Sequence, residues 1–162
     1  MHGLHHYEVS VEWTGNLGDG TAHYTGYRRD HLIAAPQKST IEGSADPAFR
    51  GDASRWNPEE LLVASVSACH KLWYLHLCAG RGISVLSYRD DAIGDMLEDP
   101  DMGGRFTQIT LRPVVTIRRG DDMDAARKIH RLAHEKCFIA NSLNFPVTCD
   151  ATVEQEESKR SA

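Results

Sequence analysis

The chain has 162 residues, of which 41% are hydrophobic and 25% charged, which is typical of one globular domain with its own core. Its formal net charge of -5 argues against nucleic acid as a partner, because no basic face is long enough to follow a phosphate backbone. Four cysteines without a C-x-x-C pair disfavour a secreted disulfide framework, so we expect reduced thiols in a cytoplasmic protein.

We expect neither a signal peptide in residues 1–20 nor a membrane span. Residues 1–20 contain no apolar h-region and no cleavage site. The richest apolar run is interrupted by polar side chains, namely Ser67, His70, Lys71 and His76. No membrane partner is therefore predicted.

The N-terminal third is predicted to be an antiparallel meander. Residues 7–13 alternate between apolar and polar side chains, the period of a strand with one buried face. Short strand candidates follow at 21–27, 29–34 and 39–41. Residues 43–55 are rich in Gly, Pro, Asp and Ser, which indicates a loop into the next element.

A central helix is predicted over residues 56–82. Asn57 is its expected N-cap, with Pro58 at the first helical position, and Gly80 and Gly82 end it. Apolar residues occupy nearly every face, the pattern of a helix buried on all sides. Because one small sheet cannot cover every face, a second subunit is expected to cover the remainder.

The chain after this helix supplies the rest of the sheet. A strand is predicted at 83–93, an acidic connection at 98–104, and a long strand at 106–117 that only Pro113 interrupts. Residues 121–143 have apolar side chains at spacings of three and four, which predicts an amphipathic helix.

A last short strand is predicted at 147–153. The predicted fold is therefore α+β, with an antiparallel sheet packed on a long buried central helix and a second amphipathic helix. We expect one domain over residues 1–162, with a core at about 7–153.

The candidate chemistry lies in two thiols, Cys69 on the central helix and Cys137 on the second. A thiolate is a good nucleophile only if a nearby cation stabilises it, and Arg50 and Arg55 are nearest in sequence. Glu59 could hold such an arginine in a bidentate pair. Ten residues of helix separate Glu59 from Cys69 by about 15 Å, so either an arginine spans the gap or the glutamate comes from a partner subunit.

The motifs around these residues resemble those of one family. N-P-E-E-L-L at 57–62, S-A-C-H at 67–70, H-E-K-C at 134–137 and S-x-x-x-P-V at 142–147 are similar to the OsmC/Ohr family, the osmotically inducible protein C and organic hydroperoxide resistance proteins. The resemblance covers roughly residues 7–153. It implies an intertwined homodimer of α+β subunits with two thiol peroxidase sites at the interface.

The resemblance also implies residue roles. Cys69 matches the peroxidatic cysteine, which an organic hydroperoxide oxidises to a sulfenic acid. Cys137 matches the resolving cysteine, which forms a disulfide with Cys69, and Glu59 matches the glutamate that pairs with an activating arginine. A dithiol, in the family typically a lipoyl group on a carrier protein, would reduce the disulfide. No cofactor is expected, and Cys78 and Cys149 match no motif and are expected to be structural.

The sequence offers several candidates for the activating arginine. Arg50 lies nearest to the family register, off by about one residue, with Arg55, Arg28 and Arg29 as alternatives. Cys137 is followed by F-I-A-N-S rather than the C-P-x-S of many family peroxidases, a departure at the resolving site.

Two other functions compete with a peroxidase. His130, His134 and Cys137 recur at i, i+4 and i+7 on one helix, and Cys69 with His70 could complete a metal site. The other is a non-catalytic OsmC-like protein that binds a small ligand at a dimer interface. A Cys-His hydrolase is weaker, because no third orienting residue is evident.

Overall fold

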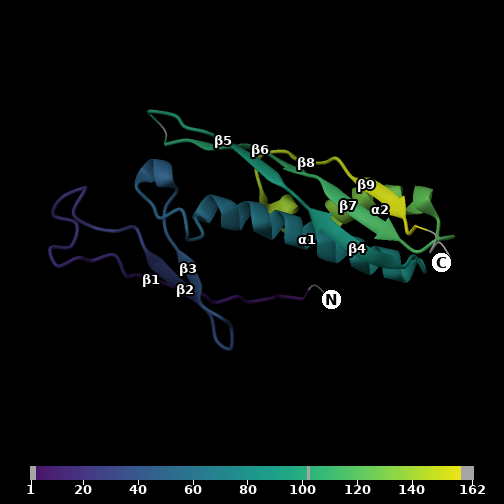
Figure 1. Cartoon of the computed structure of the whole chain (residues 1–162), viewed down its shortest axis with the longest axis horizontal. Coiled ribbons are helices and arrows are strands. Elements are labelled where there is room, and N and C mark those ends of the chain that lie inside the picture. The colour runs from purple at the N-terminus through teal and green to yellow at the C-terminus, as the bar shows by residue number, and fades with distance from the viewer. Residues whose placement is uncertain (1–2, 102, 158–162) are drawn as a thin grey trace, which may run out of the picture. The chain divides into compact units, whose positions relative to one another are not determined.

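The computed structural model describes residues 3–101 and 103–157. Residue 102 of the predicted acidic connection, and the ends of the predicted domain at 1–2 and 158–162, lie outside this part. The chain groups into two compact units, one ending at Leu61 and the other beginning at Leu62. Figure 1 labels their helices and strands.

The first unit is a three-stranded antiparallel meander, as predicted. It contains β1 (Ser10–Trp13), β2 (His31–Ala34) and β3 (Ile41–Gly43) in the order β1-β2-β3, followed by the short 3-10 helix η1 (Pro47–Phe49).

The strand predicted at 21–27 is wrong, because these residues form turns. Their backbone is bonded locally: the carbonyls of Tyr24 and Tyr27 accept hydrogen bonds from the Arg29 guanidinium at 2.9 and 2.7 Å. A carbonyl satisfied by a nearby side chain gains less from a sheet ladder.

Helix α1 runs from Pro58 to Gly80 and begins where its capping residues predict. The Asn57 side chain accepts from the Glu60 N–H at 2.7 Å, and the Glu60 carboxylate accepts from the Asn57 N–H at 3.2 Å. This reciprocal pair is a capping box, which satisfies two N–H groups that the helix itself leaves free.

Within one chain α1 buries one face, rather than all sides as the apolar pattern suggested. Its buried residues recur every four positions and are Val66, His70, Tyr74 and Cys78. Leu72, on another face, is 62% exposed. By length and composition α1 could also cross a membrane, a test that core helices of soluble proteins pass too, so this is weak evidence.

The second unit combines two three-stranded sheets with α1 and α2 (Met123–Lys136). One sheet has the order β4-β7-β9 and the other β5-β6-β8. These strands are β4 (Val85–Asp90), β5 (Ile93–Leu97), β6 (Arg105–Leu111), β7 (Pro113–Ile117), β8 (Val147–Cys149) and β9 (Thr152–Gln155). The pairs β4·β7 and β5·β6 are antiparallel, whereas β8 and β9 join their neighbours in parallel.

The strand predicted at 83–93 ends at Asp90, before β5 begins at Ile93, and the strand predicted at 106–117 is split in two at Arg112. The N–H of Arg112, between β6 and β7, donates to the Asp90 carboxylate at 2.7 Å. Helix α2 also ends earlier than predicted, at Lys136, and only the 3-10 helix η2 (Ala140–Ser142) follows. Its start is as predicted, since Asp122 caps the Ala125 N–H at 2.9 Å.

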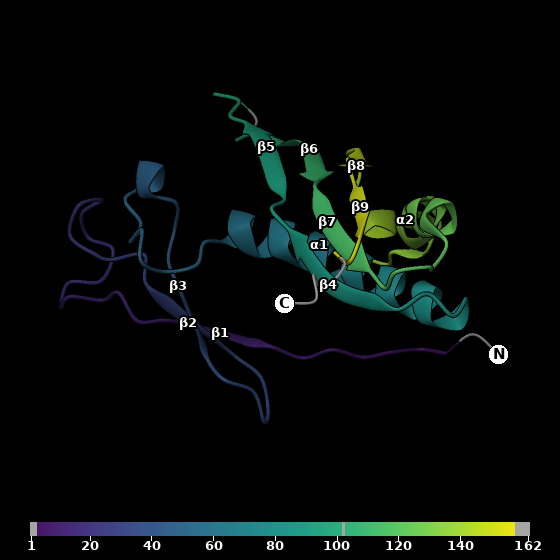
Figure 2. The same ribbon diagram turned by 45° about the vertical axis from the view of Figure 1, so that its right-hand side comes forward.

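The main core of this unit lies between the β4-β7-β9 sheet and the two helices, which Figure 2 shows beside its strands. Tyr74 of α1, Ile129 of α2 and Val115 of β7 belong to it, and all three are fully buried. A second cluster joins Val66 of α1 to Ile109 of β6. The predicted α+β fold is confirmed.

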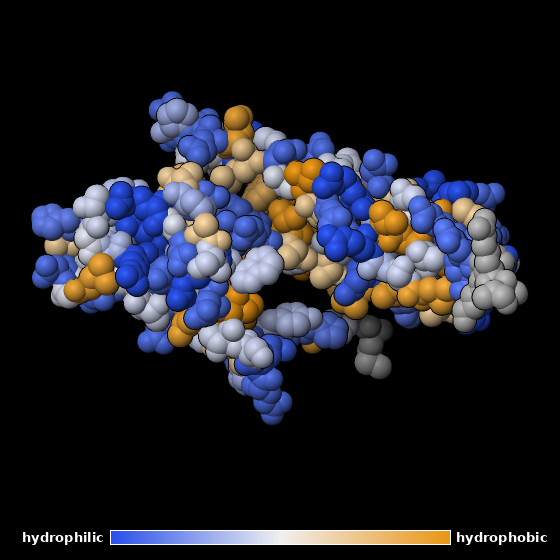
Figure 3. Space-filling model, in the orientation of Figure 1, coloured by the Kyte–Doolittle hydropathy of each residue, from blue (hydrophilic) through white to orange (hydrophobic). Residues whose placement is uncertain are grey.

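Several large apolar side chains stay exposed in a single chain. Val11 of β1 is 65% exposed and Phe138, after α2, is 68% exposed. Figure 3 shows apolar areas among hydrophilic ones over both units. Exposed apolar area of this kind favours association with another protein surface.

Candidate functional site

Two of the four cysteines interact electrostatically in the second unit. Cys69 lies in the middle of α1, and Cys137 is the C-cap residue directly after α2. The Cys69 thiol lies close enough to act on the pKa of Cys137, and both are free thiols. Cys137 is buried whereas Cys69 is half-buried, so only Cys69 faces a route from solvent.

The end of α2 determines the state of Cys137. Its sulfur accepts a hydrogen bond from the Ala140 N–H at 3.5 Å, but burial outweighs this effect. Burial, with a smaller contribution from the Cys69 thiol, raises the pKa of Cys137 to about 11. Cys137 is therefore a neutral thiol at pH 7.

Cys69 opens onto an apolar pocket of about 300 Å³. The pocket is lined by Cys69, Leu72, Trp73, His76 and Phe138. The Trp73 ring meets Phe138 edge to face, with ring centroids 5.5 Å apart. A cavity of this size and lining accepts a small apolar molecule beside the sulfur.

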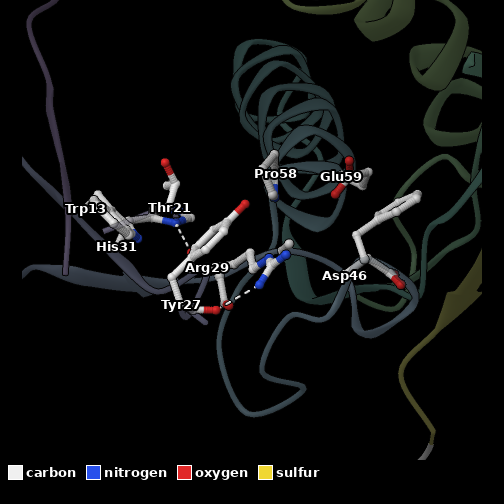
Figure 4. A pocket seen from close by; sticks show the side chains of 11 residues that line it. Trp13, Thr21, Tyr27, Arg29, His31, Asp46, Pro58 and Glu59 are labelled. Carbon is white, nitrogen blue, oxygen red and sulfur yellow. Dashed lines mark hydrogen bonds between the residues drawn. The ribbon is translucent and has the colours of Figure 1, made fainter. Parts of the chain in front are cut away.

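Glu59 and Arg29 line a pocket of about 430 Å³ in the first unit (Figure 4). The Arg29 guanidinium lies over the rings of Tyr24 and Tyr27 at 4.6 and 4.1 Å. Together with its hydrogen bonds to their carbonyls, this stacking fixes the plane of the cation.

The arginine nearest to the family register is placed differently. Arg50 ends η1 with a left-handed backbone, φ 65°, and its guanidinium lies 5.9 Å from the Tyr24 ring. It is not among the residues that line the pocket of Glu59 in the described part of the chain.

Arg55 is held by carboxylates. It lies within 4.0 Å of three of them, at 3.9 Å from Asp30, 3.6 Å from Glu42 and 3.7 Å from Asp52. Of the four arginines considered from the sequence, Arg29 is the one that lines the pocket with Glu59.

The structure brings together three potential metal ligands, which include His70 and His130 of the predicted site but have Cys149 in place of His134, Cys137 and Cys69. Nε2 of His70 lies 3.1 Å from Nδ1 of His130, and the Cys149 sulfur lies 3.8 and 3.9 Å from these two atoms. Among the described residues this is the one such group. Cys137, which follows α2, is not part of this group and interacts with Cys69 instead.

Burial governs the charges of this cluster. His70 and His130 are 1% and 5% exposed, and desolvation lowers the pKa of His70 to about 4 and that of His130 to about 3. Burial also raises the pKa of the Cys149 thiol to about 12. The two imidazoles and the thiol are therefore neutral at pH 7.

Comparisons with known proteins identify the fold. The sequence profile described as OsmC-like protein matches residues 51–152. An OsmC-like protein of unknown function from Vibrio cholerae is 29% identical with a TM-score of 0.83, over 91% of this chain and 99% of that chain. No curated protein matches the sequence.

Two further structures share the fold at lower identity. The organic hydroperoxide resistance protein OsmC from Legionella pneumophila is 16% identical with a TM-score of 0.68, over 94% of this chain and 99% of that chain. OhrB, the organic hydroperoxide resistance protein of Bacillus subtilis, is 20% identical with a TM-score of 0.54, over 93% and 98%. The profile match spans more than half of the sequence, and the chain belongs to the OsmC family.

Proposed function

We propose that this protein is a thiol peroxidase that reduces organic hydroperoxides to alcohols. The observation that carries the proposal is that Cys69, which lines the apolar pocket, lies close enough to the buried Cys137 thiol to act on its pKa. Oxidation of a half-buried thiol beside a second, buried thiol leads directly to a disulfide. The names of the Legionella and Bacillus structures agree with this chemistry.

The proposed reaction has three steps: oxidation of Cys69, formation of a disulfide with Cys137, and reduction of that disulfide. The Cys69 thiolate attacks the distal peroxide oxygen, the O–O bond breaks, and the alkoxide leaves as an alcohol after taking up a proton. The Cys137 sulfur then attacks the Cys69 sulfenic acid, so that an S–S bond forms and water leaves. A dithiol reductant finally exchanges with the disulfide, returning two thiols and becoming a cyclic disulfide itself.

The pocket accounts for a preference for organic peroxides. Trp73, Leu72 and Phe138 present apolar surface beside the attacking sulfur. Burial of an alkyl or aryl group there contributes roughly 25 cal/mol per Å² of apolar surface, which hydrogen peroxide cannot gain.

Arg29 and Glu59 are proposed to activate Cys69 across a homodimer. Glu59 is ten positions from Cys69 on α1, about 15 Å along the axis, so it does not reach the sulfur of its own helix. A second copy supplies the cation and also covers the apolar surface that one chain leaves exposed. Light scattering tests the dimer: a monomer at every concentration contradicts this arrangement.

A cytoplasmic location and a lipoyl-type dithiol reductant belong to the same proposal. Four free cysteines suit a reducing compartment. A dithiol is preferred over a monothiol because its second sulfur releases the mixed disulfide intramolecularly.

Turnover tests the function. Cumene hydroperoxide is added to catalytic amounts of protein with excess dihydrolipoamide, and peroxide loss is followed for wild type, Cys69→Ser and Cys78→Ser. The matched control Cys78→Ser removes another thiol of the same helix and keeps activity, whereas Cys69→Ser abolishes it. Wild-type turnover no faster than the protein-free reaction would leave the non-catalytic, ligand-binding role as the better account.

A further inference from the structure

The trio of His70, His130 and Cys149 belongs to three elements that come together in the second unit. His70 lies on α1, His130 on α2 and Cys149 at the end of β8, and 79 residues separate His70 from Cys149. The peroxidase steps use none of them. Two imidazoles and a thiol within 4.8 Å of one another form a donor set that transition metals favour.

The distances fit a tetrahedral ion. With about 2.05 Å to each nitrogen and about 2.3 Å to sulfur, tetrahedral angles place two nitrogens about 3.3 Å apart and each nitrogen about 3.6 Å from sulfur. The corresponding distances here are 3.1, 3.8 and 3.9 Å. Each differs by about 0.3 Å or less from the tetrahedral value, and the two rings must also turn so that both nitrogens face the ion rather than each other.

We propose that His70, His130 and Cys149 bind a zinc-class divalent transition metal through Nε2, Nδ1 and Sγ. A mixed nitrogen and sulfur donor set suits Zn²⁺ and excludes Ca²⁺ and Mg²⁺, which require oxygen ligands. The ion replaces the hydrogen bond between the two imidazoles, and thiolate formation at Cys149 releases one proton to solvent.

The surroundings of the trio favour a dication. The Asp90 carboxylate acts electrostatically on both His70 and Cys149. It is held in place by the Ser67 hydroxyl at 2.5 Å and by the Arg112 N–H at 2.7 Å. A fixed anion near His70 and Cys149 attracts a divalent cation electrostatically.

A pocket leads to the trio and gives the metal an open coordination position. It measures about 480 Å³ and is lined by two members of the trio, His130 and Cys149, together with one acidic side chain, Asp150, and the cations Arg127 and Arg131. In the described part of the chain no fourth protein ligand joins the group. Three protein ligands with a solvent-filled fourth position are the pattern of a reactive, rather than a purely structural, zinc site.

Cobalt spectroscopy tests the site in the full-length reduced protein. One equivalent of Co²⁺ is expected to give intense tetrahedral ligand-field bands and a thiolate-to-cobalt charge-transfer band, and Zn²⁺ is expected to displace it. The double variant Cys69→Ser/Cys137→Ser keeps the charge-transfer band, because neither residue is a ligand. Cys149→Ser loses it, and the matched control Cys78→Ser keeps it.

Three results would overturn the proposal. They are a wild-type protein without the charge-transfer band, a band that disappears in the Cys69→Ser/Cys137→Ser variant, and a band that persists in Cys149→Ser. The first two results come from proteins in which His70, His130 and Cys149 are all intact. They therefore test the metal site even if Cys149→Ser fails to fold. Retention of one equivalent of Zn²⁺ after gel filtration, measured by elemental analysis, is the expected independent result.

Discussion

Acidification should destabilise this protein through its two buried imidazoles. His70 and His130 have pKa values of about 4 and about 3 in the folded chain, because burial disfavours the charged ring. An unfolded histidine has a pKa of about 6.5. The folded pKa is depressed, so the stabilisation is fully present above about pH 6.5 and is lost as the pH falls from there toward the folded values.

The size of the destabilisation follows from the difference between the folded and unfolded pKa values of the two histidines. Between pH 7.5 and pH 5, the unfolded chain binds protons at both positions while the folded chain binds almost none. Each histidine then lowers the free energy of unfolding by about 2 kcal/mol, or about 4 kcal/mol for the pair. This is a large share of the roughly 5–15 kcal/mol that stabilises a typical domain.

Urea unfolding of metal-free protein measures the effect at several pH values in this range. Wild type should lose about 4 kcal/mol, and His130→Asn, although less stable at pH 7.5, should lose about 2 kcal/mol less on acidification. His76→Asn, which replaces an exposed histidine of α1, the helix that carries His70, should show the wild-type slope. Equal pH slopes for wild type and His130→Asn would refute a buried neutral pair.

Three further outcomes test the peroxidase. Arg29→Ala should slow the oxidation of Cys69 by cumene hydroperoxide about 10–100-fold in stopped flow, because a lost charged hydrogen bond costs about 1.5–3 kcal/mol. Arg50→Ala should react at nearly the wild-type rate. A slow Arg50→Ala variant beside a fast Arg29→Ala variant would assign the activating role to Arg50. Phe138→Ala should raise KM for cumene hydroperoxide about tenfold and leave the rate with hydrogen peroxide unchanged; an equal loss for both peroxides would count against an apolar binding site. Because the pKa of Cys137 is about 11, formation of the disulfide after oxidation should accelerate about tenfold per pH unit between about pH 7 and pH 9, and a flat profile by rapid quench would contradict this.

Local signals in the sequence predict the elements that they control directly. The capping residues of α1 form the predicted hydrogen bonds, and alternation places β1 within the predicted strand, although all four β1 residues are exposed in one chain and the expected buried face is absent from it. The break of the predicted long strand at Arg112 is not predictable in the same way. The Arg112 N–H donates there to Asp90, 22 residues away, and such partners are set by the tertiary fold.

The candidate site, too, was predictable from the sequence only where local motifs determine it. The motifs predict Cys69 and Cys137, which the structure brings close enough to interact. Sequence distance favoured Arg50, because nothing local indicates that the turns before β2 place Arg29 in the pocket of Glu59. Cys149 was missed as a partner of His70 for a similar reason, since the parallel pairing of β8 with β6 has no local signal.

The most direct test of the mechanism is mass spectrometry of the reduced protein after one equivalent of cumene hydroperoxide. Peptide mapping should find one disulfide, between Cys69 and Cys137, with Cys78 and Cys149 still as thiols. In Cys137→Ser the oxidation should stop at a Cys69 sulfenic acid that dimedone traps. Unchanged thiols at excess peroxide, or a disulfide that excludes Cys69, would contradict the proposed function.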